Sequence, residues 1–303
     1  MTRRERLMAT LRGEAVDRPA VCFYELNGLD QKPEDPDPYN IFNDPSWKPL
    51  LDLTRERSDR IVLRAAALRD APPDPLASLR RTETRVEGDS THTTLTLRAG
   101  GRTLTCRTRR DRDVNTVWVT EHLLKDADDL RAWLDLPERA GGGRAHTSAV
   151  LAAEEALGDS GIVMLDTADP LCQVAALFDM GTYTVIAMTE PELFHRALER
   201  CARELHARTA AIARALPGRL WRIYGPEYAS PPYLPPRLFE EYVVRYDRPM
   251  VEAIQRHGGF ARIHSHGRLR DILPHIAATG AVGLDPIEPP PQGDVQLAEV
   301  REG

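Results

Sequence analysis

The sequence lacks the long apolar segments that mark membrane and secreted proteins. It contains no run of about 18 apolar residues, the length at which a helix can span a bilayer. The basic stretch at residues 1–14 is followed neither by an apolar core nor by a small-residue cleavage site, so we do not expect a secretory signal peptide. Both absences predict a cytoplasmic protein.

Signature motifs of several common enzyme classes are also missing. There is no Gly-rich dinucleotide or phosphate loop, no Gly-x-Ser-x-Gly and no His-Glu-x-x-His, so chemistry based on NAD, ATP or a serine nucleophile has no support. The four cysteines are far apart and form no Cys-x-x-Cys pair, which predicts reduced thiols. With 40 basic against 46 acidic residues the net charge is -6, which argues against a nucleic-acid-binding protein.

What the chain does contain is an alternation of short apolar runs with segments of helical periodicity. We predict strands of parallel type at residues 20–24, 59–66, 161–171, 220–224, 260–264 and 282–287. We predict helices at residues 2–13, 45–58, 126–134, 148–157, 172–188, 191–216, 236–257 and 269–279, and the start of another at 296–302. This order favours an α/β fold with a parallel sheet inside a layer of helices.

At 303 residues, the chain is long enough for a single domain over residues 1–303, and we expect a TIM (β/α)8-type barrel. Because such a barrel needs eight strands, we expect its last strand and helix to be missing from this chain. A different pattern interrupts the barrel at about residues 80–121, where Thr-rich segments of period two are separated by Gly-containing turns. This region predicts an inserted antiparallel β meander of three or four strands.

Two histidines at the end of a predicted strand are the strongest candidates for chemistry. His264 and His266 have the spacing that places alternate side chains of a strand on one face, and imidazole is a good ligand for Zn²⁺. The carboxyl edge of parallel strands is where barrels bind ligands, which favours a pair of metal ligands. The alternative is two hydrogen-bonded polar residues at a strand end.

Carboxylates follow the neighbouring strands. Glu227 can supply a third metal ligand or transfer a proton, or it simply braces the Pro-rich loop that follows it. Asp285 and Glu288 end the next strand, where either can orient a metal-bound histidine through its second ring nitrogen, and Glu288 is also a catalytic candidate. For Asp294 we favour a simpler role, the N-cap of the final helix.

Further polar side chains stand at the other strand ends. We predict that Asp166 acts as an acid or base and that Asp169 binds a substrate amine or hydroxyl. Cys172 is either a soft zinc ligand or, as we favour, a small buried side chain. The remaining candidates for substrate binding are Tyr24, Asn27, Tyr224 and Tyr228.

Three segments together resemble a known family. They are the opening TRRERLMATLRGEAVDRPAV, the central GPEYASPPYLPPRLFEEYV, and HSHG followed by DILPHIAATGAVGLDPIEPPPQGDVQLAEV. Outside the Thr-rich region, the chain resembles the uroporphyrinogen decarboxylase superfamily, and more closely its methyltransferase-type branch, which includes cobalamin-linked methyltransferases. The Arg-rich substrate motif of the true decarboxylase has no counterpart after Val21. The resemblance therefore points away from that activity.

The resemblance implies a TIM-type barrel and a zinc site. In the methyltransferase branch, zinc is held by a His-x-Cys pair, by a further Cys near the C-terminus and, in some members, by a Glu. Here His264 matches the family histidine, His266 replaces the cysteine, and Glu227 is the nearest carboxylate match. The downstream cysteine has no counterpart, so the ligand set differs from the family pattern and the identity of the methyl acceptor stays open.

We therefore predict a zinc-assisted methyltransferase that acts on a small methylated donor or a thiol acceptor. Zinc on His264, His266 and Glu227 would act as a Lewis acid and would convert a bound thiol to a thiolate at neutral pH. A corrinoid (cobalamin) carried by a partner protein would dock over the barrel mouth, because the chain has no corrinoid-binding motif. A homodimer is suggested only by analogy at the level of the fold.

Two other hypotheses stay open. One is a metal-free decarboxylase or lyase for an acidic substrate, with Asp166 or Glu227 and the histidines as acid and base. Arg262 and Arg268 flank the histidines and can neutralise substrate carboxylates, or Arg262 points outward. The other is a non-catalytic protein that binds a small ligand. Metal content distinguishes the first of the three hypotheses from the second, and turnover distinguishes either enzyme from the binding protein.

Overall fold

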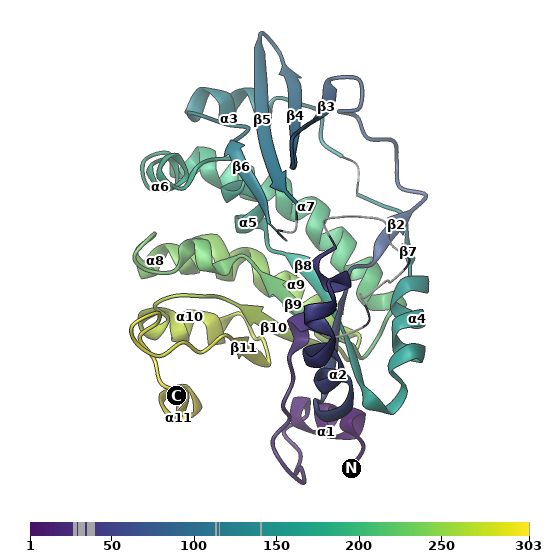
Figure 1. Cartoon of the computed structure of the whole chain (residues 1–303). Coiled ribbons are helices and arrows are strands. Elements are labelled where there is room, and N and C mark those ends of the chain that lie inside the picture. The colour runs from purple at the N-terminus through teal and green to yellow at the C-terminus, as the bar shows by residue number, and fades with distance from the viewer. Residues whose placement is uncertain are drawn as a thin grey trace.

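A parallel sheet of five strands forms the centre of the molecule (Figure 1). The computed structural model describes residues 1–26, 29, 34, 40–112, 114, 116–139 and 141–302. The strand order is β1-β8-β9-β10-β11, with all neighbours parallel. The strands are β1 (Arg60–Arg64), β8 (Gly161–Ala168), β9 (Leu220–Tyr224), β10 (Phe260–His264) and β11 (Gly283–Asp285). The predicted α/β fold with a parallel sheet is confirmed, whereas closure into an eight-stranded barrel stays a prediction.

Helices follow the strands along the chain, and Figure 1 shows α7 and α9 running beside each other along the sheet. The helices are α1 (Arg3–Leu11), α2 (Lys48–Arg57), α3 (Ala127–Leu134), α4 (Ser148–Leu157), α5 (Pro170–Ala175), α6 (Met180–Thr189), α7 (Pro191–Ala215), α8 (Pro236–Phe239), α9 (Arg245–Arg256), α10 (Leu273–Ala278) and α11 (Leu297–Glu302). Helix α1 begins with a capping box, in which the Thr2 hydroxyl accepts from the Glu5 N–H at 3.1 Å and the Glu5 carboxylate accepts from the Thr2 N–H at 2.8 Å.

The two faces of the parallel sheet are covered by different elements. Alternate residues of the strands, such as Leu165, Trp221 and Ile263, lie on the α7 face, where they share one large apolar core with α4, α7 and α9. The residues between them lie on the α1 face, where a small apolar cluster forms over the amino ends of the strands. That cluster consists of Leu7, Ile61, Ile162, Met164 and Leu220. Farther along the strands, the same face is polar.

The inserted β meander is confirmed. Its four antiparallel strands are β3 (Arg80–Glu87), β4 (Ser90–Ala99), β5 (Arg102–Asp111) and β6 (Val117–Glu121). Leu97, Ala99 and Leu104 are buried in the large core, and Figure 1 shows the meander at one end of the molecule beside α3. A further two-stranded antiparallel sheet, β2 (Ala67–Arg69) with β7 (Arg144–His146), was not predicted. It pairs a segment before the meander with a segment after it.

The strand predicted at residues 20–24 is wrong. This segment has no ladder and ends in a 3-10 turn, Tyr24–Leu26. A side chain holds it instead, because the buried Asp59 carboxylate accepts from the Val21 N–H at 2.8 Å and from Arg6 and Arg18 at 2.6 and 2.7 Å. The apolar composition of the segment reflects its packing over α1 and not a place in the sheet.

Three predicted helices also differ from the structure. The helix at 172–188 is divided into α5 and α6, because Asp179 accepts from the N–H groups of Gly181 and Thr182 and starts a new helix. The helix at 236–257 contains a π-helical turn, Glu240–Val244, between α8 and α9. The segment at 269–279 begins with a 3-10 turn, where Asp294 accepts from the N–H groups of Leu269 and Arg270. Asp294 therefore caps this turn, a role different from the predicted one.

Candidate functional site at the carboxyl edge of the sheet

Polar side chains gather on the α1 face near the carboxyl ends of the strands. Asp166, Arg222 and Arg262 occupy neighbouring positions across β8, β9 and β10. Two residues farther along, His264 pairs in register with Tyr224 and with Asp285 of β11. Because residues two apart on a strand share a face, all of these side chains leave the sheet on the same side. We call Tyr24, Asp166, Arg222, Arg262, His264 and Asp285 the polar cluster.

Asp166 is held by an arginine that the sequence did not single out. Arg222 donates to its two oxygens from Nε and Nη2 at 2.7 and 3.0 Å. Burial alone would lower the pKa of Arg222, but the hydrogen bonds and charge of Asp166 outweigh it and raise that pKa above its ordinary value. The predicted acid or base is therefore in the cluster, with both oxygens engaged in a bidentate ion pair.

Asp285 connects the other members of the cluster. Its Oδ2 lies 3.1 Å from His264 Nδ1 and 3.5 Å from the Tyr24 hydroxyl, and its Oδ1 lies 2.7 Å from Arg262 Nε. The contact with Arg262 is an ion pair without a hydrogen bond, and Arg262 Nη2 is also buried without a hydrogen-bond partner in the described residues. Both arginines lie near the Tyr24 ring, at 5.3 Å for Arg262 and 5.7 Å for Arg222.

The second histidine has a carboxylate partner of its own. His266 Nδ1 lies 3.0 Å from Glu288 Oε1, and Glu288 Oε2 accepts from the Gly267 N–H at 2.9 Å. The Gly267 bond first, and then His266, lowers the pKa of Glu288 and favours its charged form. We predicted that either Asp285 or Glu288 orients a histidine, and in the structure each of them contacts one.

The two imidazoles adopt equivalent arrangements. Their ring centroids are 4.8 Å apart with an interplanar angle of 85°. Each ring has Nδ1 on a carboxylate, and in the tautomer with the proton on Nδ1, Nε2 offers its lone pair. No side chain of the described residues bonds to either Nε2. A carboxylate on one ring nitrogen with the other left open is the usual setting of a metal-bound or base-active histidine.

A cleft of about 420 Å³ opens beside His266. Glu227, Tyr228, Tyr233 and Arg268 line it together with His266 and the loop prolines. Glu227 Oε2 accepts from the Gly225 N–H at 3.0 Å, which holds its carboxylate over the end of β9. The cleft combines an apolar aromatic wall with a few charged groups, as small-molecule sites do.

The described residues fit a zinc site only in part. His264 and His266 present two ligand atoms in the setting described above, whereas a catalytic zinc ion takes three protein ligands. No group of three or more His, Cys, Asp or Glu side chains close enough for a metal ion occurs within the described part of the chain. Glu227 lines the cleft with His266 but does not complete such a group.

Asp169 and Cys172 do not line the cleft. Asp169 is fully buried as the N-cap of α5, where its Oδ1 accepts from the Cys172 N–H at 2.5 Å. Burial, and next the charge of buried Asp247, raises the pKa of Asp169, and burial also raises the pKa of the Cys172 thiol. Gly225, at φ +121°, covers this pair so closely that an added Cβ would lie 2.2 Å from Asp169 Oδ1. Cys172 itself is only half-buried, so our preference for a small buried side chain is met in part.

The candidate residues therefore fall into two neighbouring groups joined by the histidines. Tyr24, Asp166, Tyr224 and His264 lie in or against the polar cluster, whereas Glu227, Tyr228 and His266 line the cleft and Glu288 contacts His266. Asn27 lies outside the described residues. Sequence reasoning missed Arg222, although its two-residue offset from Tyr224 at a strand end is a usable signal.

Comparisons with known proteins bear on the fold. No protein-family model matches the chain, and no curated protein sequence matches it. Eleven chains of solved structures are similar to it. One is a methyltransferase from Methanosarcina mazei, at 18% identity with a TM-score of 0.53, over 94% of this chain and 75% of that one. At this identity the likeness shows a shared α/β fold.

Proposed function

We propose that this protein is a methyltransferase that acts on a small molecule at the carboxyl edge of its parallel sheet. The observation that carries the proposal is the similarity of 94% of the chain to a methyltransferase, together with the two oriented imidazoles at the end of β10. The sequence resemblance to the methyltransferase branch points to the same activity. The cleft beside His266 supplies the place for the substrate.

We further propose zinc binding at His264 and His266, with Glu227 as the candidate third ligand, although its carboxylate does not form a metal-sized group with them in this structure. Support comes from the two imidazoles, whose Nδ1 atoms rest on Asp285 and Glu288 so that the Nε2 atoms stay open. When bound, zinc supplies Lewis acidity and lowers the pKa of a thiol. The same proposal includes a corrinoid on a partner protein as the methyl carrier.

Methyl transfer from methylcobalamin to mercaptoethanol tests the proposal. The assay compares wild type with His264→Gln and His266→Gln, each supplied with zinc, and follows the loss of methylcobalamin absorbance. We expect kcat/KM to fall at least 100-fold in both variants, in the range typical for removal of a catalytic group. The control is His146→Gln, because His146 contacts Ser148 outside the site. Equal rates in all four proteins would contradict the proposal.

A metal-free lyase or decarboxylase is the second candidate, and one observation favours it. Arg262 Nη2 is buried on the α1 face without a hydrogen-bond partner, beside His264 with its open Nε2. A guanidinium next to an imidazole base is suited to an acidic substrate. Turnover of a carboxylic acid that survives removal of metal by a chelator, and that is lost in Arg262→Gln, would favour this candidate over methyl transfer.

A further inference from the structure

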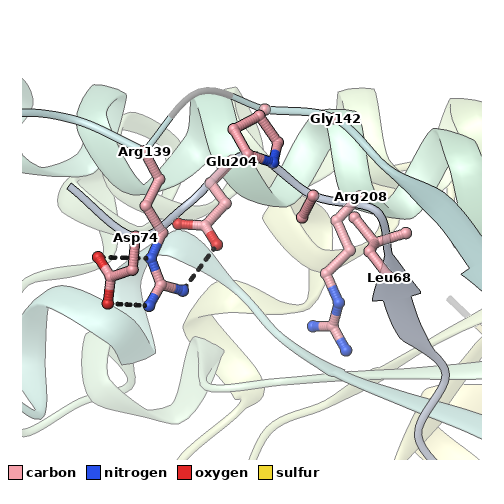
Figure 2. A pocket seen from close by; sticks show the side chains of 9 residues that line it. Leu68, Asp74, Arg139, Gly142, Glu204 and Arg208 are labelled. Atoms are coloured by element: carbon pink, nitrogen blue, oxygen red, sulfur yellow. Dashed lines mark hydrogen bonds and ion pairs between the residues drawn. The ribbon is translucent and has the colours of Figure 1, made fainter. Parts of the chain in front are cut away.

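A second cavity lies away from both histidines, beside β2 and α7 (Figure 2). Its volume is about 340 Å³, within the range of sites for small organic molecules. Leu68, Ala71 and Pro72 give it an apolar wall, and Gly141 and Gly142 form another side without side chains. An added Cβ at Gly142 would lie 3.8 Å from Pro72 Cδ, so glycine keeps the space in front of Pro72 open.

One end of this cavity is lined by two carboxylates and a single guanidinium. Arg139 lies between two carboxylates, with Nη2 at 2.9 Å from Asp74 Oδ2 and Nη1 at 3.6 Å from Glu204 Oε1. Figure 2 shows these three side chains together, with Arg208 and Leu68 apart from them. The Arg139 hydrogen bond lowers the pKa of Asp74 to about 2, so Asp74 stays ionised at neutral pH.

The other end carries a positive charge without a carboxylate. Arg208 of α7 donates from Nη2 to the Ala66 carbonyl at 3.1 Å and forms no ion pair within the described residues. The two acidic residues that line the cavity are both engaged with Arg139. Arg208 also borders another, much narrower cavity, together with Asp166 and Thr167 of β8. Asp166 is paired with Arg222. The Arg208 guanidinium thus stands near the carboxyl end of β8.

We propose that this cavity binds a small carboxylate with a short apolar body. The planar fork of Arg208 matches a carboxylate, and the apolar wall of Leu68, Ala71 and Pro72 accommodates the hydrocarbon part. Asp74 and Glu204 repel a second negative charge at the opposite end, which selects a monocarboxylate over a dicarboxylate. This binding site is separate from the proposed methyl-transfer site and does not depend on it.

Hexanoate is the probe, with hexanol and inorganic phosphate as matched comparisons. Calorimetry should show saturable binding of hexanoate to wild type, and at least tenfold weaker binding of hexanol and phosphate. Arg208→Gln should weaken hexanoate binding at least tenfold. Arg203→Gln should not, because Arg203 on the same helix is paired with Glu138 and does not line the cavity. Equal hexanoate affinity of wild type and Arg208→Gln, or tighter binding of phosphate, would overturn the proposal.

A second measurement uses only wild-type protein, so its result does not depend on whether a variant folds. Wild-type protein is treated with phenylglyoxal, which modifies arginine, and the modified residues are located by mass spectrometry with and without hexanoate. Hexanoate should slow modification of Arg208 at least threefold and leave Arg203 unchanged. Equal modification of Arg208 in both samples would contradict binding at this site, even if methyl transfer by the protein were confirmed.

Discussion

The two faces of the parallel sheet use the same strands for different purposes. In β10, Ala261 and Ile263 are buried in the large core on the α7 face, whereas Arg262 and His264 lie on the α1 face in the polar cluster. Residues of α4, α7 and α9 pack on the first face, whereas α1 packs on the amino end of the second. The comparison teaches that a step of one residue along a strand separates a side chain that stabilises the fold from one available for chemistry.

The substitution with the largest expected effect on the free energy of unfolding is on the α7 face. Ile263→Ala should lower the free energy of unfolding by about 2–5 kcal/mol, because Ile263 is fully buried and its truncation leaves a cavity in the core. Urea denaturation followed by circular dichroism measures the loss. Ile263→Val is the graded control, expected at about 0.5–1.5 kcal/mol. A loss below about 0.5 kcal/mol for the alanine variant would show that the two faces do not differ as described.

A buried carboxyl within the α7-face core has a smaller effect on the free energy of unfolding, and this effect depends on pH. Asp247 of α9 is fully buried, neither of its oxygens has a hydrogen-bond partner in the described residues, and burial raises its pKa. The folded protein therefore holds a proton that the unfolded chain loses above about pH 4, so this group's contribution to stability declines as pH rises. Asp169 is the titratable group that faces Asp247, and Glu227 and Cys172 are next to Asp169.

Asp247→Asn removes this titration. The variant should gain stability relative to wild type as pH is raised from 4 to 7, which urea denaturation at several pH values measures. If the unfolding free energies of the two proteins run parallel over this range, Asp247 does not carry a proton in the folded state.

The smallest expected effect on stability is at the cleft. His266→Ala should change the free energy of unfolding by no more than about 0.5 kcal/mol, because its side chain is 52% exposed. Thermal melting compares the stability of the two proteins, and melting with and without zinc tests metal binding. Zinc should raise the melting temperature of wild type and not that of the variant, since only a folded protein with the complete pair gains from binding. Equal zinc stabilisation of both proteins would place the metal elsewhere.

Much of the fold could be predicted from local sequence pattern. The bounds of β9 and β10 agree with the prediction, because each is a short apolar run that ends at a turn or polar loop. The segment at 20–24 has the same composition but is held by the Asp59 carboxylate, a contact that 38 residues of separation conceal. Likewise, the division between α5 and α6 depends on Asp179, whose capping role is not visible in an apolar run.

The sequence could predict those parts of the site whose residue types are informative. Histidines and carboxylates at successive strand ends predicted that Asp285 or Glu288 contacts a histidine, because parallel strands bring their carboxyl ends to one edge, but the pairing of each carboxylate came from the structure. Arg222 and Arg208 were missed, because arginine is frequent along the whole chain and its partner is decided by packing. Asp169 stands at the same edge but turns inward to cap α5, which spacing alone does not reveal.

Zinc content tests the central proposal, metal-assisted methyl transfer at the histidine pair, most directly. Protein without a polyhistidine tag is incubated with zinc, dialysed and subjected to elemental analysis, for wild type and for the variant with both His264→Ala and His266→Ala. We predict about one zinc ion per wild-type chain and its loss in the double variant. No zinc in the wild type, or equal zinc in both proteins, would contradict a metal site at His264 and His266.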